Sequence, residues 1–162
     1  MIANRLFCRA VTATPQEEYA VFQGASKLTL DPKGRISMPT RHRDQLVTGC
    51  DGRLTVTRHP DGCLLVYPRP RWEAKREELA VLPYAARALQ RLLLGNAIDL
   101  ELDTAGRLLI PNGLREDARL TREATLIGMG AHFELWDPEL LRQNEERDLA
   151  NGLPEAAAGF SF

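Results

Sequence analysis

One short stretch of the sequence is rich in side chains that can bind phosphate or the edges of DNA bases. Residues 27–43 contain five basic side chains and one acidic side chain, Asp31, which gives a local net charge of +4. The basic residues are Lys27, Lys33, Arg35, Arg41 and Arg43. Affinity for DNA comes largely from neutralised phosphates, and an arginine or lysine in the major groove can also reach guanine. The stretch therefore predicts DNA contact, with a solvated basic surface as the alternative.

The centre of this stretch predicts a tight β-turn at residues 31–34. Asp31 can accept backbone N–H bonds, the proline that follows has a fixed φ, and Gly34 tolerates the unusual φ near the end of the turn. We expect strands over residues 27–30 and 35–38 to form a hairpin around it. Asp31 and Arg35 would then be close enough for a charge-assisted pair. That pair could serve only to hold the turn, but the basic neighbours of Arg35 favour a role in binding.

The same pattern occurs again 72 residues later without a gap. Residues 30–46 (LDPKGRISMPTRHRDQL) match residues 102–118 (LDTAGRLLIPNGLREDA) at four positions of the motif, which in the second copy are Asp103, Gly106, Arg107 and Pro111. The equivalent window, residues 99–115, has two basic and three acidic side chains and a net charge of −1. This difference in charge predicts that the first copy contacts DNA. The second copy is expected to complete the fold.

The elements around each motif follow one order. A helical stretch begins at the proline, two strands follow, and a charged helix ends the copy. The predicted strands are 54–57 and 64–67 in the first copy and 125–129 and 133–136 in the second; the predicted charged helices are 71–80 and 138–149, the latter capped by Asp137. Between the copies, apolar residues of 85–93 lie on one helical face, and Gly95 is a natural stop. This helix is expected to pack the halves together or to contact another subunit.

The composition limits the possible classes of protein. The chain has 162 residues, a net charge of −1 and 44% hydrophobic residues, as in ordinary globular domains. Its three cysteines form no C-x-x-C pair, which predicts inert reduced thiols and neither a disulfide framework nor a zinc site. No nucleophile motif or phosphate-binding glycine loop is present, so we expect neither an enzyme nor a cofactor or small-molecule substrate. No apolar run reaches about 20 residues, which predicts a cytoplasmic protein without membrane association.

The order of motifs resembles the MraZ family of bacterial transcriptional regulators. The resemblance covers residues 21 to about 150 and is carried by DPKGRISMPTRHR, QRLLLGNA, DTAGRLLIP and FELWD. It implies an α+β, mainly β fold in which tandem SpoVT/AbrB-like swapped-hairpin modules form a pseudo-dimeric β-barrel with flanking helices. It places the family's D-x-x-x-R motif on Asp31 with Arg35 and again on Asp103 with Arg107.

The resemblance also implies what the protein does. Such a protein forms a ring-like homo-oligomer, is nucleoid-associated and binds repeated promoter sites upstream of its own division and cell-wall gene cluster, as a repressor. Several weakly binding protomers held in one ring gain avidity, so a nearly neutral chain can suffice. Two alternatives stay open. One is an AbrB-like antitoxin that binds a toxin, and the other is a purely structural ring-forming protein.

The motifs predict the division of the chain. We expect module 1 over residues 25–72, a helical connection over 73–100, module 2 over 101–144 and a flexible tail over 150–162. Members of the resembled family begin Met-Phe-x-Gly, and the matching residues here are Val21, Phe22, Gln23 and Gly24. We therefore expect residues 1–20 to be a non-native or disordered extension that arises from an over-extended gene model.

Overall fold

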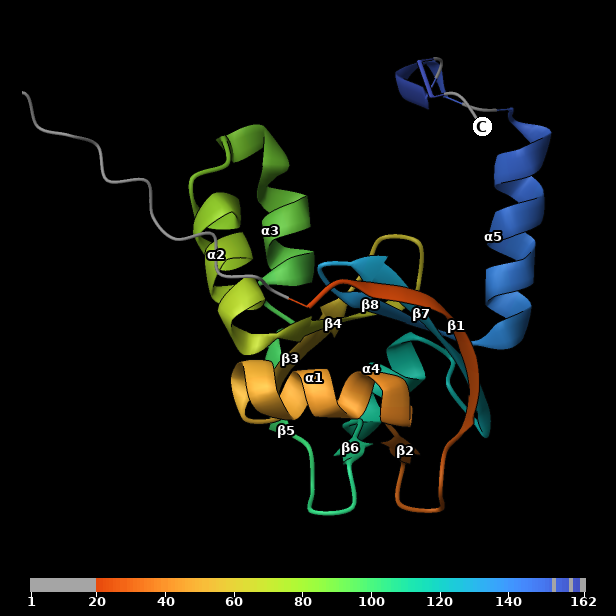
Figure 1. Ribbon diagram of the computed structural model, residues 1–162. Helices are drawn as coiled ribbons and strands as arrows, with labels where there is room; N and C mark the ends of the chain where they lie inside the picture. Colours follow the sequence, from red (N-terminus) through yellow and green to blue (C-terminus); the bar gives the residue numbers. More distant parts are fainter. Residues whose placement is uncertain (1–19, 153, 158, 161–162) are drawn as a thin grey trace, which may run out of the picture.

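The computed structural model describes residues 20–152, 154–157 and 159–160. Within them the chain forms a mixed α/β fold, in which most strands belong to one antiparallel sheet (Figure 1). The strands are β1 (Phe22–Thr29), β2 (Arg35–Ser37), β3 (Arg53–Arg58), β4 (Leu64–Pro68), β5 (Ile98–Glu101), β6 (Arg107–Leu109), β7 (Glu123–Gly130) and β8 (Phe133–Trp136). The helices are α1 (Thr40–Cys50), α2 (Arg69–Ala80), α3 (Arg87–Leu93), α4 (Asn112–Asp117) and α5 (Pro138–Ala150), with 3-10 turns at Tyr84–Ala86 and Glu155–Ala157.

The main sheet interleaves strands from the two halves of the chain. Its order is β1-β7-β8-β4-β3-β5, so β1 of the first half pairs with β7 of the second, and β5 of the second half pairs with β3 of the first. The halves meet at the centre, where β4 pairs with β8 and Leu65 lies opposite Glu134. The outer strands β1 and β5 do not pair with each other, so the described strands form no closed barrel, in contrast to the expected β-barrel.

The short strands β2 and β6 form a separate two-stranded ribbon that relates the two copies of the motif. Ile36 pairs with Leu108, its own counterpart at the 72-residue offset. The Met38 N–H donates to the Gly106 carbonyl at 2.9 Å, and the equivalent Ile110 N–H donates to the Gly34 carbonyl at 3.0 Å. These matched bonds give the ribbon a local twofold pseudosymmetry about the Ile36–Leu108 pair.

The predicted hairpin between residues 27–30 and 35–38 is therefore wrong. β1 pairs along its whole length with β7, and β2 pairs with β6. Only the turn itself joins the two flanks, through the Asp31 N–H to the Arg35 carbonyl and the Gly34 N–H to the Asp31 carbonyl. Exchange of strands lets Ile36 and Leu108 enter one shared core, where both are fully buried. A local pattern defines a strand and its turn but not the distant strand that pairs with it.

Two apolar clusters cover opposite faces of the sheet. One lies toward α1, α4 and the ribbon and includes Phe22, Leu46 and Phe133. The other lies toward α2 and α3 and includes Trp72, Leu79 and Trp136. Figure 1 shows α2 and α3 on the side of the sheet opposite to α1 and α4. Successive residues of β4 alternate between the clusters, as side chains of a doubly covered strand must.

The two cysteines of the described residues lie within these clusters. Cys50 and Cys63 are free and buried, and burial raises the pKa of both thiols. Buried thiols with a raised pKa are the kind that the sequence analysis predicts for these two residues, and their inertness stays a prediction. Cys8 lies outside the described residues, and so does all of the predicted extension at residues 1–20 except its last residue.

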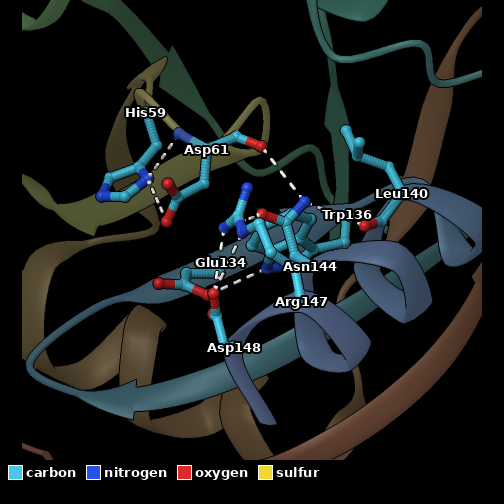
Figure 2. Close-up of polar contacts among 8 residues, drawn as sticks. All are labelled: His59, Asp61, Glu134, Trp136, Leu140, Asn144, Arg147 and Asp148. Carbon is cyan, nitrogen blue, oxygen red and sulfur yellow. Dashed lines mark hydrogen bonds and ion pairs between the residues drawn. The ribbon is translucent and has the colours of Figure 1, made fainter. Parts of the chain in front are cut away.

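Polar contacts cap helix α5 and join it to the β3–β4 turn. The Asp137 carboxylate accepts the backbone N–H groups of Glu139 and Leu140, which confirms the predicted cap. Figure 2 shows the buried Asn144 side chain between the helix and the β3–β4 turn, where it donates to the Leu140 carbonyl at 2.9 Å and the Asp61 carbonyl at 3.5 Å. Among the described residues, no group of histidine, cysteine and acidic side chains could hold a metal ion. The hydrogen bonds of Asn144 join α5 to the β3–β4 turn, which is a structural role.

The other predicted elements are found with small shifts. The predicted strands lie within β3, β4, β7 and β8, and the predicted helix over 71–80 begins earlier, at Arg69. The apolar stretch 85–93 divides into a 3-10 turn and α3, and its apolar face is only partly covered, since Leu93 is buried but Leu89 is 37% exposed. No helix among the described residues has the length and apolar character needed to cross a bilayer.

Candidate nucleic-acid interface

The first Asp-Arg turn is held by one carboxylate. Asp31 Oδ1 accepts the backbone N–H groups of Lys33 and Arg35, both at 2.9 Å, and Oδ2 accepts from Arg35 Nε at 2.6 Å. The hydrogen bond from the Arg35 backbone, helped by the others, lowers the pKa of Asp31. Gly34 ends the turn at a φ of +81°, in the left-handed region that favours glycine. The predicted pairing of Asp31 with Arg35 is confirmed.

The second turn repeats this geometry. Asp103 Oδ1 accepts the backbone N–H groups of Ala105 and Arg107 at 2.9 Å, and Oδ2 accepts from Arg107 Nε at 2.8 Å. The pKa of Asp103 is lowered, chiefly by the hydrogen bond from the Arg107 backbone. In Figure 1 the two turns project on the same side of the molecule, next to the ribbon of β2 and β6. The second copy thus contributes directly to the surface on which the first copy's turn stands.

Each turn is covered by an arginine from the other half of the chain. A Cβ added to Gly106 would lie 2.6 Å from Arg43 Cδ, and a Cβ added to Gly34 would lie 2.6 Å from Arg115 Nε. Arg43 and Arg115 are themselves 72 residues apart. Arg43 also donates to the Met38 carbonyl at 3.1 Å. A Cβ at either glycine would force the covering arginine to shift, in addition to the strain of the positive φ.

Arg43 supports the second turn. Its side chain lies against Gly106, and its Nε is buried without a hydrogen-bond partner in the described part of the chain. The DNA contact that the sequence predicts for Arg43 stays a prediction. Arg115 was not singled out from the sequence, although the 72-residue offset was the signal that could have identified it.

The other predicted contact residues form two groups. Lys33 and Arg35 lie at the first turn, and the side chain of Lys33 is exposed. Arg41 lies beside β1, where it donates to Ser26 Oγ at 2.8 Å and to the Ala25 carbonyl at 3.3 Å. Lys27 follows on the same strand and is exposed. The structure therefore separates a turn group (Lys33, Arg35) from a β1 group (Lys27, Arg41).

His42 lies in the core rather than on this surface. Its ring is buried between Phe22 and Phe133, with ring centroids 5.7 Å and 5.0 Å away. Burial, together with the charge of Arg41, lowers the pKa of His42, and Arg41 Nε donates to His42 Nε2 at 3.1 Å. The histidine therefore packs the first core cluster.

The ribbon presents one outer face between the turns. Arg35, Ser37, Arg107 and Leu109 alternate with the buried Ile36 and Leu108 and therefore share that face. The Ile110 N–H bonds to the Gly34 carbonyl at one end of the ribbon, and the Met38 N–H bonds to the Gly106 carbonyl at the other. Gly106 of the second turn therefore lies opposite a residue that is four positions after Gly34 of the first turn. At a rise of about 3.4 Å per residue this is roughly 14 Å. We call this surface the turn face: residues 31–37 and 103–109 together with the arginines that cover the turns.

The chain is similar to a set of named regulators. The family model described as "MraZ protein, putative antitoxin-like" matches residues 21–92 and again residues 93–159, two matches that begin 72 residues apart. A protein of Bordetella pertussis strain Tohama I named "Transcriptional regulator MraZ" is 61% identical over 142 residues, which are 88% of this chain and all of that protein. Proteins of the same name from Herminiimonas arsenicoxydans and Burkholderia mallei are 54% and 52% identical over the same shares. These names are those of a regulator rather than an enzyme, in agreement with the sequence prediction.

Proposed function

Because the chain belongs to the MraZ family, we propose that it is a sequence-specific DNA-binding transcriptional regulator. The observation that supports this most directly is the turn face. Two Asp-Arg turns of equal geometry project on one side of the molecule, and the first has an exposed lysine as well. The relatives' shared name, which is that of a transcriptional regulator, agrees with such a surface.

The turn face has dimensions suited to the major groove of DNA. The major groove is about 12 Å wide and admits a two-stranded ribbon such as that of β2 and β6. Asp31 holds Arg35 through its Nε. The two terminal nitrogens of Arg35 make no hydrogen bond to the described residues, so they would be available to a ligand. Guanidinium groups of this kind bind guanine or phosphate in a defined direction.

The remaining basic residues have supporting roles. Lys33 lies exposed at the turn and would contact a phosphate, and Lys27 and Arg41 on the β1 side would contact the flanking backbone. Arg43 acts indirectly, because it packs against the second turn and fixes its position. Preorganised contacts of this kind lose less conformational entropy when DNA binds.

The fold supports a tandem arrangement of two AbrB-like swapped-hairpin modules. The matched bonds of the ribbon and the exchange of β1 and β5 between the halves are the relations that two swapped copies of one module would have. We include a ring-like homo-oligomer in the proposal. A net charge of −1 and a few basic contacts per chain give weak single-site binding, which several linked copies would strengthen through avidity.

Such a regulator would occupy repeated promoter elements upstream of its own gene, in a division and cell-wall gene cluster. Its binding would repress that cluster. Its location would be cytoplasmic and nucleoid-associated. A gel-shift assay with the DNA upstream of the protein's own gene tests the central part. The expected result is a shifted complex that survives excess unrelated DNA. Loss of the complex in the presence of any competitor of equal length would contradict sequence-specific binding.

An antitoxin function is the second candidate, because the matched family model is described as antitoxin-like. Its test is co-purification of the chain from its own organism. A small toxin that remains bound in stoichiometric amount would favour the antitoxin, whereas the protein alone or with DNA would favour the regulator. The presence of two motif copies in one chain favours the regulator.

A further inference from the structure

We propose that Leu109 contacts the 5-methyl group of a thymine and thereby gives the turn face a preferred direction on its DNA site. The inference rests on the proposed function and adds a specificity-determining residue to it. Leu109 belongs to neither apolar cluster of the fold.

Leu109 lies at the end of the ribbon next to the first turn, on the surface that would enter the groove. It lies in β6 directly opposite Arg35 in β2, on the outer face of the ribbon. Its neighbours along the strand, Leu108 and Ile110, are fully buried, whereas Leu109 is 50% exposed. A single exposed leucine is ordinary on a protein surface. This one, however, lies between two arginines that are each fixed by an aspartate, where water would be displaced when DNA binds.

The residue at the equivalent position in the other half has different chemistry. Under the 72-residue offset Leu109 corresponds to Ser37, while the arginines and the buried pair of the ribbon are matched. Serine can donate or accept a hydrogen bond, whereas leucine offers only apolar contact, for which the thymine methyl is the partner in the major groove. The two ends of an otherwise pseudosymmetric ribbon therefore present different groups to DNA.

The positive charges near Leu109 favour DNA over an apolar protein surface as its partner. The first turn carries Lys33 beside Arg35, whereas the equivalent residue of the second turn is Ala105. The more cationic turn is therefore the one next to Leu109, because Arg35 pairs with Leu109. An apolar protein partner would have to cover these cations without neutralising them. DNA provides phosphates for the cations and a methyl group in the groove for the leucine. A direction follows, because reversal of the duplex would place Ser37 over the methyl.

The test compares thymine with deoxyuridine, which lacks only the 5-methyl group. Duplexes are selected from a random-sequence pool with the wild-type chain, and each thymine of the bound site is replaced in turn by deoxyuridine. Binding is measured by competition for wild type, Leu109→Ser and a control, Leu149→Ser, which alters an exposed leucine on α5. Size-exclusion chromatography and thermal unfolding establish that the variants keep their assembly and fold.

For wild type and Leu149→Ser, we expect one or two thymines at which loss of the methyl weakens binding about fourfold, the value for one buried methyl group. For Leu109→Ser we expect no loss at those positions. Equal losses in wild type and Leu109→Ser, with specific binding intact, would overturn the role of Leu109 and leave the regulator proposal standing. A changed oligomer size in Leu109→Ser would overturn it too, since the leucine would then contact protein. If no duplex is enriched by selection, the proposed function and this inference both fail.

Discussion

The side chain of Arg43 packs against the backbone of Gly106, which lies 63 positions further along the chain, so closely that a Cβ there would be 2.6 Å from Arg43 Cδ. The same contact exists between Arg115 and Gly34. Each half of the protein therefore supports the turn of the other. The turn face is a joint product of both copies, and its geometry depends on residues that do not themselves need to touch DNA.

The first prediction concerns this contact. Gly106→Ala should lower the free energy of unfolding by at least about 1–2 kcal/mol, because the φ of +73° is unfavourable for alanine and Arg43 must move. Urea denaturation measures the change. Gly113→Ala in α4 is the matched control, since its added Cβ meets nothing within 4 Å, and it should leave stability unchanged or slightly raised. Equal effects of the two substitutions would refute the packing argument.

Arg35→Ala should weaken specific DNA binding about 10- to 100-fold and leave the fold and the oligomer size intact. The arginine would lose its contact to a base or phosphate, whereas a partly exposed ion pair contributes little to stability. Fluorescence anisotropy gives the affinity, and size-exclusion chromatography gives the assembly. Arg76→Ala, an exposed position on α2, is the control. If Arg35→Ala dissociates the oligomer, the residue is structural and its assigned role is wrong.

Lys33→Ala should weaken binding uniformly across DNA sequences and lower the salt dependence of the affinity by one phosphate contact. The logarithm of the affinity should then change less steeply with the logarithm of salt concentration, by about 0.9. Titrations at several salt concentrations measure the slope. Lys75→Ala on α2, a lysine that pairs with Glu78, should leave the slope as in wild type. An unchanged slope in Lys33→Ala would mean that Lys33 contacts no phosphate.

The buried His42 should make stability depend on pH near neutrality. Burial lowers the pKa of His42 in the folded state from its usual value of 6.5, so the unfolded chain takes up a proton at higher pH than the folded chain does. The free energy of unfolding should therefore be largest above about pH 6.5 and fall as the pH drops below it. Urea denaturation between pH 7.5 and 5.5 tests this. This range lies above that in which the carboxyl groups with a lowered pKa titrate.

His42→Leu should reduce that dependence without disrupting the fold, because leucine occupies the equivalent position 114 in the second half. Some dependence should remain, since burial also lowers the pKa of His132. A slope in His42→Leu identical to that of wild type would show that His42 does not titrate differently in the two states.

Short-range features of the chain were predictable from the sequence because they depend on local backbone energetics. Asp31 and Gly34 define a turn, and Asp137 caps a helix, through hydrogen bonds to residues within four positions. The 72-residue offset identified the second turn at Asp103 for the same reason. The basic character of residues 27–43 and the family of the chain were likewise present in the residue types themselves.

Only the tertiary structure decided which distant groups meet. Three features depend on pairings across 63 to 108 residues: the exchange of strands between halves, the support of each turn by Arg43 and Arg115, and the exposure of Leu109 between buried neighbours. A sequence pattern specifies which side chains seek burial but not the surface that buries them. The sequence thus identified the basic turn at residues 31–34 and its repeat at residues 103–106. The fold placed both turns on one face, because Ile36 and Leu108 are buried in one core by the pairing of the two ribbon strands.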